Sequence, residues 1–324
     1  MMEDAASKSL KPFNFRQISN HIPELKSINT DISTISFDHP IDSSNMSPQV
    51  WIKLAKLIAE NYRKYDGFVI LHGSDTMAFT ASALSFMLEN LNKPVILTGS
   101  QLPMGILRTD GKENLITAIE IAAKAESGKA LVPEVAIYFE YQLYRGNRTH
   151  KFNSEHFQAF QTANYPVLAE AGVHIKFNKN VIHKNTKRKL LVHTKLNTNI
   201  AVLKLFPGIS KEVVESVLTI KGLKAVLLET FGSGNAPTDK WFINLLKKAI
   251  ENEIIIFNIT QCNSGSVQQG KYETSMHLKE IGVIGGGDIT YEAAITKLMF
   301  LLGSIHSKNE IRKLLSKSIR GEIS

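Results

Sequence analysis

The chain has 324 residues, of which 43% are hydrophobic and 21% are charged. These fractions are typical of soluble globular proteins with a packed core, and they exclude a disordered chain. No apolar run approaches the roughly 18 residues that a membrane-spanning helix needs, so we expect no membrane partner.

In the first half of the chain, short β-branched runs alternate with runs of helical periodicity. The predicted elements are a helix over 48–61, a strand over 68–71, a helix over 76–90, a strand over 94–98, a helix over 113–124 and a strand over 135–140. In the first helix, Val50, Leu54, Leu57 and Ile58 form one apolar face. This alternation predicts an α/β fold with a mainly parallel sheet.

The second half repeats the alternation after a polar, basic stretch. The predicted elements are strands over 201–205, 225–228 and 254–258, and helices over 211–219, 239–251, 291–302 and 310–318. We therefore expect two α/β domains, a larger N-terminal domain over 1–185 and a smaller C-terminal domain over 200–324. The polar residues 186–199 are interpreted as the linker between them.

The formal net charge of +8 and the pI of about 9.3 raise the possibility of a nucleic-acid partner. The basic residues are spread along the chain, however, and the densest cluster, His183 to His193, has no interleaved aromatic residues. We interpret this cluster as a solvated surface segment and expect no nucleic-acid partner.

The first eight residues and the cysteine count indicate the compartment. Residues 1–8 are small and acidic, unlike a signal peptide. Cys262 is the only cysteine, so no intrachain disulfide can form, which fits a reducing cytoplasm. Cys262 is also a possible nucleophile, but no nearby histidine stands in an obvious activating role.

The segment His72 to Met77 (HGSDTM) follows a predicted strand and begins a helix. The carboxyl ends of parallel strands are where open α/β sheets bind ligands, and a helix start offers free N–H groups to a carboxylate. The segment is therefore a candidate binding site for an amino acid. The alternative is that Ser74 or Asp75 only caps the helix.

Two other polar segments carry candidate residues. Asp42, Ser43 and Ser44 precede the first long helix, where hydroxyl and backbone donors suit a carboxylate and an aspartate suits an ammonium; the alternative is an ordinary Asx or Ser turn. Lys151 follows the strand over 135–140, and a desolvated lysine can act as a base on a hydroxyl. Most lysines are exposed and have no such role.

Glycine-rich turns follow two further strands. Residues 231–237 (FGSGNAP) and 285–288 (GGGD) lack the glycine spacing of a dinucleotide site. The sequence also has no phosphate-binding P-loop and no paired-cysteine or H-E-x-x-H metal motif. We therefore expect no organic cofactor and no metal, and His72 is interpreted as a packing residue at the end of a strand.

Together these motifs resemble the bacterial type I asparaginase family, the cytoplasmic L-asparaginases. Residues 66–103 (DGFVILHGSDTMAFTASALSFMLENLNKPVILTGSQLP) look like the signature region of that family. The resemblance continues in residues 41–46, 143–151, 206–210, 231–237, 260–265 and 283–290. Because it spans nearly the whole chain, the combination is far more specific than any single motif.

The resemblance implies an amidohydrolase that converts L-asparagine to L-aspartate and ammonia through a covalent acyl-enzyme. In the family a threonine, an aspartate and a lysine assist proton transfer, and they correspond here to Ser74, Asp75 and Lys151. The substrate loop corresponds to 42–44, with Asp75 also holding the substrate ammonium. Asn235 resembles a residue near the site. Ser74 departs from the usual threonine, which keeps the hydroxyl but loosens the rotamer because the β-branch is gone.

A second departure concerns the start of the chain. The family begins with a strand and a T-G-G-T-I-G-M turn that carries the nucleophilic threonine, and Met1 coincides with the last residue of that turn. We expect Met1 to be an internal methionine of a longer reading frame, and the 324-residue chain to have little or no turnover. A stop codon upstream of Met1, with no in-frame T-G-G-T-I-G sequence, would contradict this expectation.

Three other functions stay open at the level of sequence. Glutaminase activity differs by one methylene of the substrate, which a pocket discriminates by only about 1–3 kcal/mol. A non-catalytic protein that binds asparagine or aspartate would keep the substrate loop without releasing ammonia. A nucleic-acid-binding protein would show salt-dependent DNA binding. The resemblance also implies a homodimer or a homotetramer.

Overall fold

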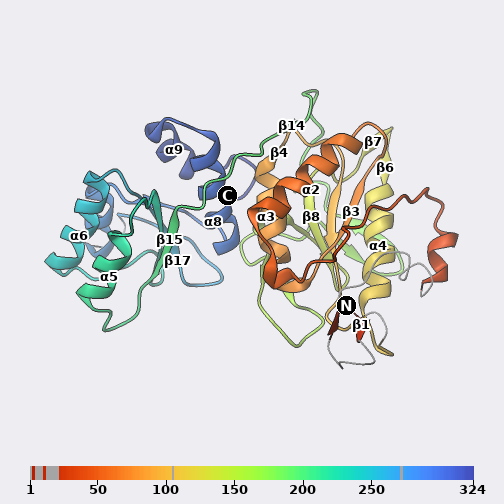
Figure 1. Ribbon diagram of the computed structural model, residues 1–324. Coiled ribbons are helices and arrows are strands. Elements are labelled where there is room, and N and C mark those ends of the chain that lie inside the picture. Colours follow the sequence, from red (N-terminus) through yellow and green to blue (C-terminus); the bar gives the residue numbers. More distant parts are fainter. Residues whose placement is uncertain (1, 4–9, 12–21, 104–105, 271–272) are drawn as a thin grey trace. The chain divides into compact units, whose positions relative to one another are not determined.

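The computed structural model describes residues 2–3, 10–11, 22–103, 106–270 and 273–324 (Figure 1). Met1, on which the expectation about the start of the chain rests, lies outside the described residues. The chain forms two compact units, Met1–Thr162 with Pro166–Val192, and Ala163–Tyr165 with His193–Ser324. The functional domain boundaries 1–185, 186–199 and 200–324 stay a proposal.

The first unit contains a six-stranded sheet in the order β13-β12-β9-β8-β5-β3. Its strands are β3 (Phe68–Leu71), β5 (Val95–Thr98), β8 (Val135–Phe139), β9 (Gln142–Arg145), β12 (Ala169–Ala171) and β13 (Ile175–Phe177). β3, β5 and β8 run parallel, whereas β9, β12 and β13 extend the sheet by antiparallel pairing. Leu71 pairs with Thr98, so the carboxyl ends of β3 and β5 are level with each other.

Three helices accompany this sheet: α3 (Met77–Met87) and α4 (Gly111–Ala123) pack on its strands, and α2 (Pro48–Asn61) packs on α3. In Figure 1, α2 and α3 lie on one side of the strands and α4 lies on the other. α3 is apolar nearly all round and almost wholly buried, because it is covered by α2 as well as by the sheet. It begins directly after the β3 turn, so that turn is held on a rigid base.

Short elements complete the first unit. They are η1 (Pro23–Ser27), η2 (Ser43–Asn45), η3 (Ser74–Thr76) and η4 (Gly146–Arg148), and the strand pairs β1 (Met2–Glu3) with β2 (Leu10–Lys11), β4 (Leu88–Glu89) with β14 (Leu191–Val192), β6 (Ala125–Glu126) with β7 (Lys129–Ala130), and β10 (His150–Lys151) with β11 (Phe160–Gln161). The η3 and β10 segments carry candidate site residues, which the next subsection describes.

The second unit has a parallel sheet in the order β15-β16-β17-β18. Its elements are β15 (Ile200–Lys204), α5 (Lys211–Leu218), β16 (Ala225–Thr230), α6 (Lys240–Glu251), β17 (Ile255–Thr260), α7 (Glu273–Glu280), β18 (Ile284–Gly285), α8 (Tyr291–Ser304) and α9 (Lys308–Leu315). Val214, Phe242 and Leu246 of the helices bury their side chains against Val226 and Ile256 of the strands. This is the hydrophobic contact that the alternating pattern predicts.

The predicted α/β class, with two units and a mainly parallel central sheet, is confirmed. The helix over 48–61 and the strand over 68–71 have the predicted bounds. The helix over 76–90 was predicted too long: α3 ends at Met87, because Leu88 and Glu89 pair with β14 and Asn90 adopts a positive φ of 60°. The pairing strand β14 lies inside the segment predicted as a linker.

Within the described residues, no helix is both long and apolar enough to cross a membrane. Over the same part of the chain, no group of three or more histidine, cysteine, aspartate or glutamate side chains is arranged to hold a metal ion.

Candidate active site

The turns that follow β3 and β5 lie next to each other. The parallel register continues one residue past the strands, where the His72 amide donates to the carbonyl of Thr98 at 2.9 Å. The β3 turn then carries Ser74 and Asp75, and the β5 turn carries Gln101. Neighbouring carboxyl ends of parallel strands therefore present hydroxyl, carboxylate and carboxamide groups at one edge of the sheet.

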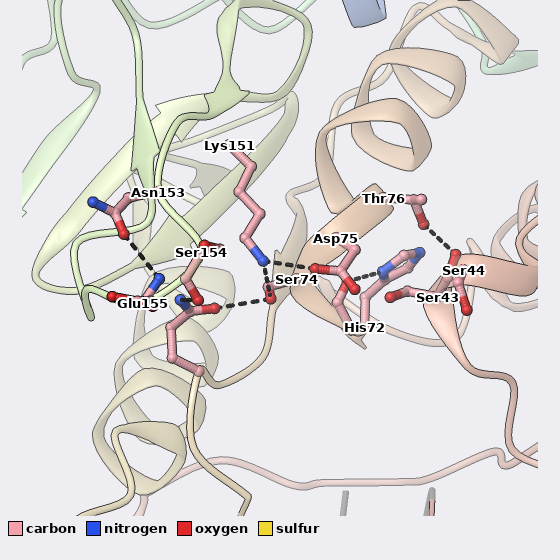
Figure 2. Close-up of polar contacts among 12 residues, drawn as sticks. Ser43, Ser44, His72, Ser74, Asp75, Thr76, Lys151, Asn153, Ser154 and Glu155 are labelled. Atoms are coloured by element: carbon pink, nitrogen blue, oxygen red, sulfur yellow. Dashed lines mark hydrogen bonds and ion pairs between the residues drawn. The ribbon is translucent and has the colours of Figure 1, made fainter. Parts of the chain in front are cut away.

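Lys151 reaches this edge from β10 and lies between Ser74 and Asp75 (Figure 2). Its Nζ donates to Ser74 Oγ at 2.9 Å and to Asp75 Oδ1 at 2.7 Å. The lysine side chain is 14% exposed and the aspartate side chain is 67% exposed. The structure thus brings together the three residues predicted from segments 77 positions apart, with the lysine shielded and the carboxylate open to solvent.

The segment around Lys151 is held by backbone pairing and by one side chain. Lys151 pairs with Phe160 in the β10–β11 ladder. Asn153 Oδ1 then accepts from the amide of Glu155 at 2.8 Å (Figure 2). It also accepts from the amide of His156 at 2.9 Å, and the two bonds close the turn between the two strands. This Asx turn fixes where the chain goes directly after the lysine.

The predicted substrate loop, Asp42 to Ser44, forms the η2 turn. Asp42 Oδ1 accepts from the hydroxyl of Ser44 at 2.6 Å and from its backbone amide at 2.9 Å. These two hydrogen bonds, mainly the one from the hydroxyl, lower the pKa of Asp42. Ser43 is buried, and its carbonyl accepts from the Thr76 hydroxyl at 2.7 Å. The loop therefore docks directly on the β3 turn.

This docking requires glycine at position 73. A Cβ at Gly73 would lie 2.6 Å from Ser43 Oγ and 2.8 Å from Ser43 Cβ. Both distances are too short for any side chain to fit unless one of the two turns moves. The glycine of the HGSDT motif therefore sets the distance between the two polar turns.

The interpretation that Ser74 or Asp75 merely caps a helix is wrong. The N-cap of α3 is Thr76, two residues after Ser74, and residues 74–76 form a separate 3-10 turn. Ser74 and Asp75 use their side chains for Lys151 instead. Turn chemistry at a strand end looks the same in sequence whether a side chain bonds its own backbone or a distant residue.

His72 joins a hydrogen-bonded chain beneath the turn. Trp51 Nε1 donates to Thr80 Oγ1 at 3.0 Å, Thr80 Oγ1 is 2.8 Å from His72 Nε2, and His72 Nδ1 is 2.6 Å from the carbonyl of Gly73. The Gly73 carbonyl can only accept, so Nδ1 carries a proton. In the neutral imidazole Nε2 then accepts from the Thr80 hydroxyl. Burial of the imidazole lowers the pKa of His72, in keeping with this neutral form.

The prediction of His72 as a packing residue at the strand end therefore needs one addition. Its ring supports the backbone of the HGSDT turn by a hydrogen bond to the carbonyl of Gly73.

The sequence pattern did not indicate Gln101 or Asp110 as site residues. Gln101 Oε1 accepts from Ser74 Oγ at 2.9 Å, and the backbone amide of Gln101 donates to Asp110 Oδ2 at 2.9 Å. The signal that could have found Gln101 is the strand-end rule that was applied to β3, because Gln101 stands three residues after the neighbouring strand β5.

In the second unit, the polar turns after the strands bond mainly to backbone. Thr260 Oγ1 donates to the carbonyl of Gly232 at 2.6 Å and accepts from the amide of Cys262 at 3.0 Å. Cys262 is exposed. The role carried over for Asn235, which lies in a bridge with Phe231, stays a prediction.

Comparisons with known proteins agree over both units. The family model described as "Asparaginase, N-terminal" matches residues 1–183, and the one described as "Glutaminase/Asparaginase C-terminal domain" matches residues 199–315. L-asparaginase 1 of Escherichia coli is 45% identical over 303 residues, which cover 94% of this chain and 87% of that protein.

Two solved structures resemble the fold of the chain. The crystal structure of L-asparaginase I from Vibrio cholerae superposes with a TM-score of 0.88 and 42% identity, covering 98% of this chain and 93% of that one. The thermostable L-asparaginase from Thermococcus kodakarensis superposes with a TM-score of 0.87 and 32% identity, covering 95% and 91%.

Proposed function

The chain belongs to the asparaginase family: it is an amidohydrolase that converts L-asparagine to L-aspartate and ammonia, and we propose that Lys151, Ser74 and Asp75 move the protons of that reaction. The reaction of this family passes through a covalent acyl-enzyme. Forming that intermediate removes a proton from the attacking oxygen and delivers one to the departing ammonia, and hydrolysis repeats both transfers with water.

The position of Lys151 Nζ, within hydrogen-bond distance of both Ser74 Oγ and Asp75 Oδ1, carries the proposal. A serine hydroxyl between a base and a reacting oxygen can pass a proton on, because it accepts one hydrogen bond while it donates another. In its neutral form the shielded amine accepts the proton through Ser74, and the Asp75 carboxylate stabilises the resulting ammonium. This group supports proton transfer, which in the family serves a separate nucleophile.

Asp42, Ser43, Ser44 and Asp75 are proposed to bind the substrate zwitterion. Ser43 and Ser44 stand at a 3-10 turn with hydroxyl and amide donors that suit the α-carboxylate, and the ionised Asp75 carboxylate suits the α-ammonium. Asp42 holds Ser44 through two hydrogen bonds and so keeps the loop in shape. Gly73 brings this loop next to the proton-transfer group.

The cellular setting is proposed as well. The family resemblance supports an enzyme of asparagine catabolism in the cytoplasm that works as a homodimer or a homotetramer. Hydrolysis of an amide by this route requires no metal or organic cofactor, because the side chains supply the proton transfer and water is the second substrate.

The direct test is ammonia release from L-asparagine by the purified 324-residue chain and by a version extended upstream to the next in-frame start, with L-glutamine and no-substrate samples beside them. We expect release from L-asparagine by the extended version, and slower release from L-glutamine because its extra methylene must fit the same pocket. The version that releases ammonia is the reference chain for the variants below. Calorimetric titration with L-aspartate runs in parallel. Aspartate binding without ammonia release from either version would replace the enzyme with a non-catalytic binding protein, and faster release from glutamine would make it a glutaminase.

A further inference from the structure

The orientation of the Gln101 carboxamide is fixed by its surroundings. Gln101 Nε2 donates to the carbonyl of Ser154 at 3.1 Å and to the carbonyl of His156 at 3.0 Å. A carbonyl can only accept, so the amide nitrogen must face this pair and the amide oxygen must face the other way. That oxygen lies 2.9 Å from Ser74 Oγ.

The fixed amide determines where the proton of Ser74 points. Gln101 Oε1 has no proton to give, and the Lys151 ammonium has no lone pair to receive one. While Lys151 is an ammonium, the hydroxyl of Ser74 therefore donates to Gln101 and accepts from Lys151. Together the two hydrogen bonds hold Ser74 Oγ beside Lys151. Once the lysine is neutral, the hydroxyl can turn its proton to the amine from the same position.

Gln101 is itself rigidly mounted. The backbone amide of Gln101 donates to Asp110 Oδ2 at 2.9 Å, and the backbone amide of Leu102 donates to Asp110 Oδ1 at 3.1 Å. Asn114 Nδ2 holds Asp110 Oδ2 at 3.1 Å from the first turn of α4. On its other side, the carboxamide contacts the turn that Asn153 closes. Gln101 thus connects α4, the β5 turn and the segment after Lys151.

Position 74 is where this chain lacks a β-branched side chain. Threonine has its χ1 angle restrained by two heavy atoms on Cβ, whereas serine moves more freely among rotamers. A hydroxyl that must stay within 2.9 Å of Lys151 needs some restraint. In this structure, the Gln101 carboxamide supplies it.

We propose that Gln101 is a positioning residue for the proton-transfer group: it holds the Ser74 hydroxyl beside Lys151 and adds a restraint that serine, unlike threonine, does not have in its own side chain. This inference rests on the proposed function of Ser74 and Lys151. It makes the importance of Gln101 depend on the residue at position 74, which a purely structural role in the loop would not do.

The test is a double-mutant cycle on kcat for L-asparagine, with Gln101→Met made in the reference chain, the version that releases ammonia, and in its Ser74→Thr variant. Methionine keeps the length of the side chain and removes both the acceptor and the donors. We expect kcat to fall about tenfold in the serine background, the effect of losing one well-placed hydrogen bond, with KM little changed. In the threonine background we expect a loss of less than about threefold. Gln49→Met, on the exposed side of α2, is the matched control.

Equal losses in the two backgrounds, or no loss in the serine background, would overturn the inference. The crystal structure of the Gln101→Met variant gives a readout that needs no turnover: we expect Ser74 Oγ to spread over more than one rotamer, and a single unchanged rotamer beside Lys151 would contradict the proposal. Lys151→Met in the same assays separates a failure of the proposed function from a failure of the role of Gln101. If Lys151→Met keeps full activity, the proposed function fails, whereas a neutral Gln101→Met beside an inactive Lys151→Met defeats only the role of Gln101.

Discussion

Each unit of the molecule contains a lysine paired with a carboxylate at the same distance, yet the two pairs have different surroundings. Lys151 Nζ lies 2.7 Å from Asp75 Oδ1, and Lys297 Nζ lies 2.7 Å from Glu322 Oε1. Lys297 and Glu322 are both fully buried, whereas the Asp75 side chain is 67% exposed. The distance alone therefore does not distinguish a structural pair from a reactive one.

The partners make the distinction. Lys297 Nζ also donates to the carbonyls of Leu315 at 3.0 Å and Lys317 at 2.6 Å, groups that cannot pass a proton on. Burial lowers the pKa of Lys297, and the Glu322 carboxylate opposes that shift. Lys151 instead donates to a hydroxyl, which can relay a proton. The first pair ties the C-terminal tail to α8, and the second is suited to chemistry.

Lys151→Met removes the amine of the exposed pair and should affect activity, not stability. It should lower kcat for L-asparagine by about 10²–10⁴-fold, the usual contribution of a general acid–base group. The free energy of unfolding should change little, because the partner carboxylate of Asp75 stays solvated. Lys179→Met, which removes an exposed lysine paired with Glu126, is the matched control and should keep full activity. A large loss of stability in Lys151→Met would mean that Lys151, like Lys297, has a structural role.

Lys297→Met should have the opposite profile. It leaves the Glu322 carboxylate buried without its cation, which we expect to cost about 3–5 kcal/mol in the free energy of unfolding measured with denaturant. No comparable loss of kcat per folded molecule should accompany it. Adding Glu322→Gln should recover part of the stability, since the stranded charge is removed. If Lys297→Met alone is as stable as the natural chain, the structural role of Lys297 is contradicted.

Gly73→Ala tests the contact between the substrate loop and the β3 turn. The added methyl meets Ser43, so the substrate loop must shift relative to Ser74 and Asp75. We expect a destabilisation of about 1–3 kcal/mol, typical of overpacking, and a raised KM for L-asparagine. Gly128→Ala, where a Cβ would meet nothing within 4 Å, tests the alternative that any glycine replacement in this unit is harmful. Because Gly128 has a φ of +74°, that control carries backbone strain but no clash.

The smallest expected effect concerns the pH dependence of stability through His72. Desolvation lowers the folded-state pKa of His72 below its ordinary value of 6.5. Between the folded pKa and 6.5 the unfolded chain binds more protons, so the contribution of His72 to the free energy of unfolding is complete above pH 6.5 and falls as the pH decreases.

His72→Asn keeps a donor for the Gly73 carbonyl but does not titrate. Its unfolding free energy should therefore decrease less than that of the natural chain between pH 6.5 and pH 5, in denaturant titrations at each pH. An identical slope in the two chains would show that His72 does not contribute to the pH dependence of stability.

The sequence predicted most of the fold because the hydrophobic pattern is periodic wherever an element packs on a core. The apolar run of β3 and the apolar face of α2 had the predicted bounds. The short antiparallel strands β9, β12 and β13 were not predicted, since three or four residues show no clear period. The end of α3 was missed because long-range pairing with β14 overrides local helix preference.

The site was predicted less evenly. Ser74, Asp75 and Lys151 came from the family resemblance, and the structure brings them within hydrogen-bond distance. Gln101 could not be assigned, because its importance lies in the direction of its amide. That direction is set by the backbone carbonyls of a distant turn, which leave no mark in the identity of any residue.

Relay of protons by the Ser74 hydroxyl to Lys151 is tested by kcat for ammonia release from L-asparagine, measured for Ser74→Ala and Ser74→Thr beside the reference chain. We expect Ser74→Ala to lose at least about 10²-fold in kcat, and Ser74→Thr, which keeps the hydroxyl, to stay active. Full activity of Ser74→Ala would contradict the relay, and with it the role assigned to Lys151.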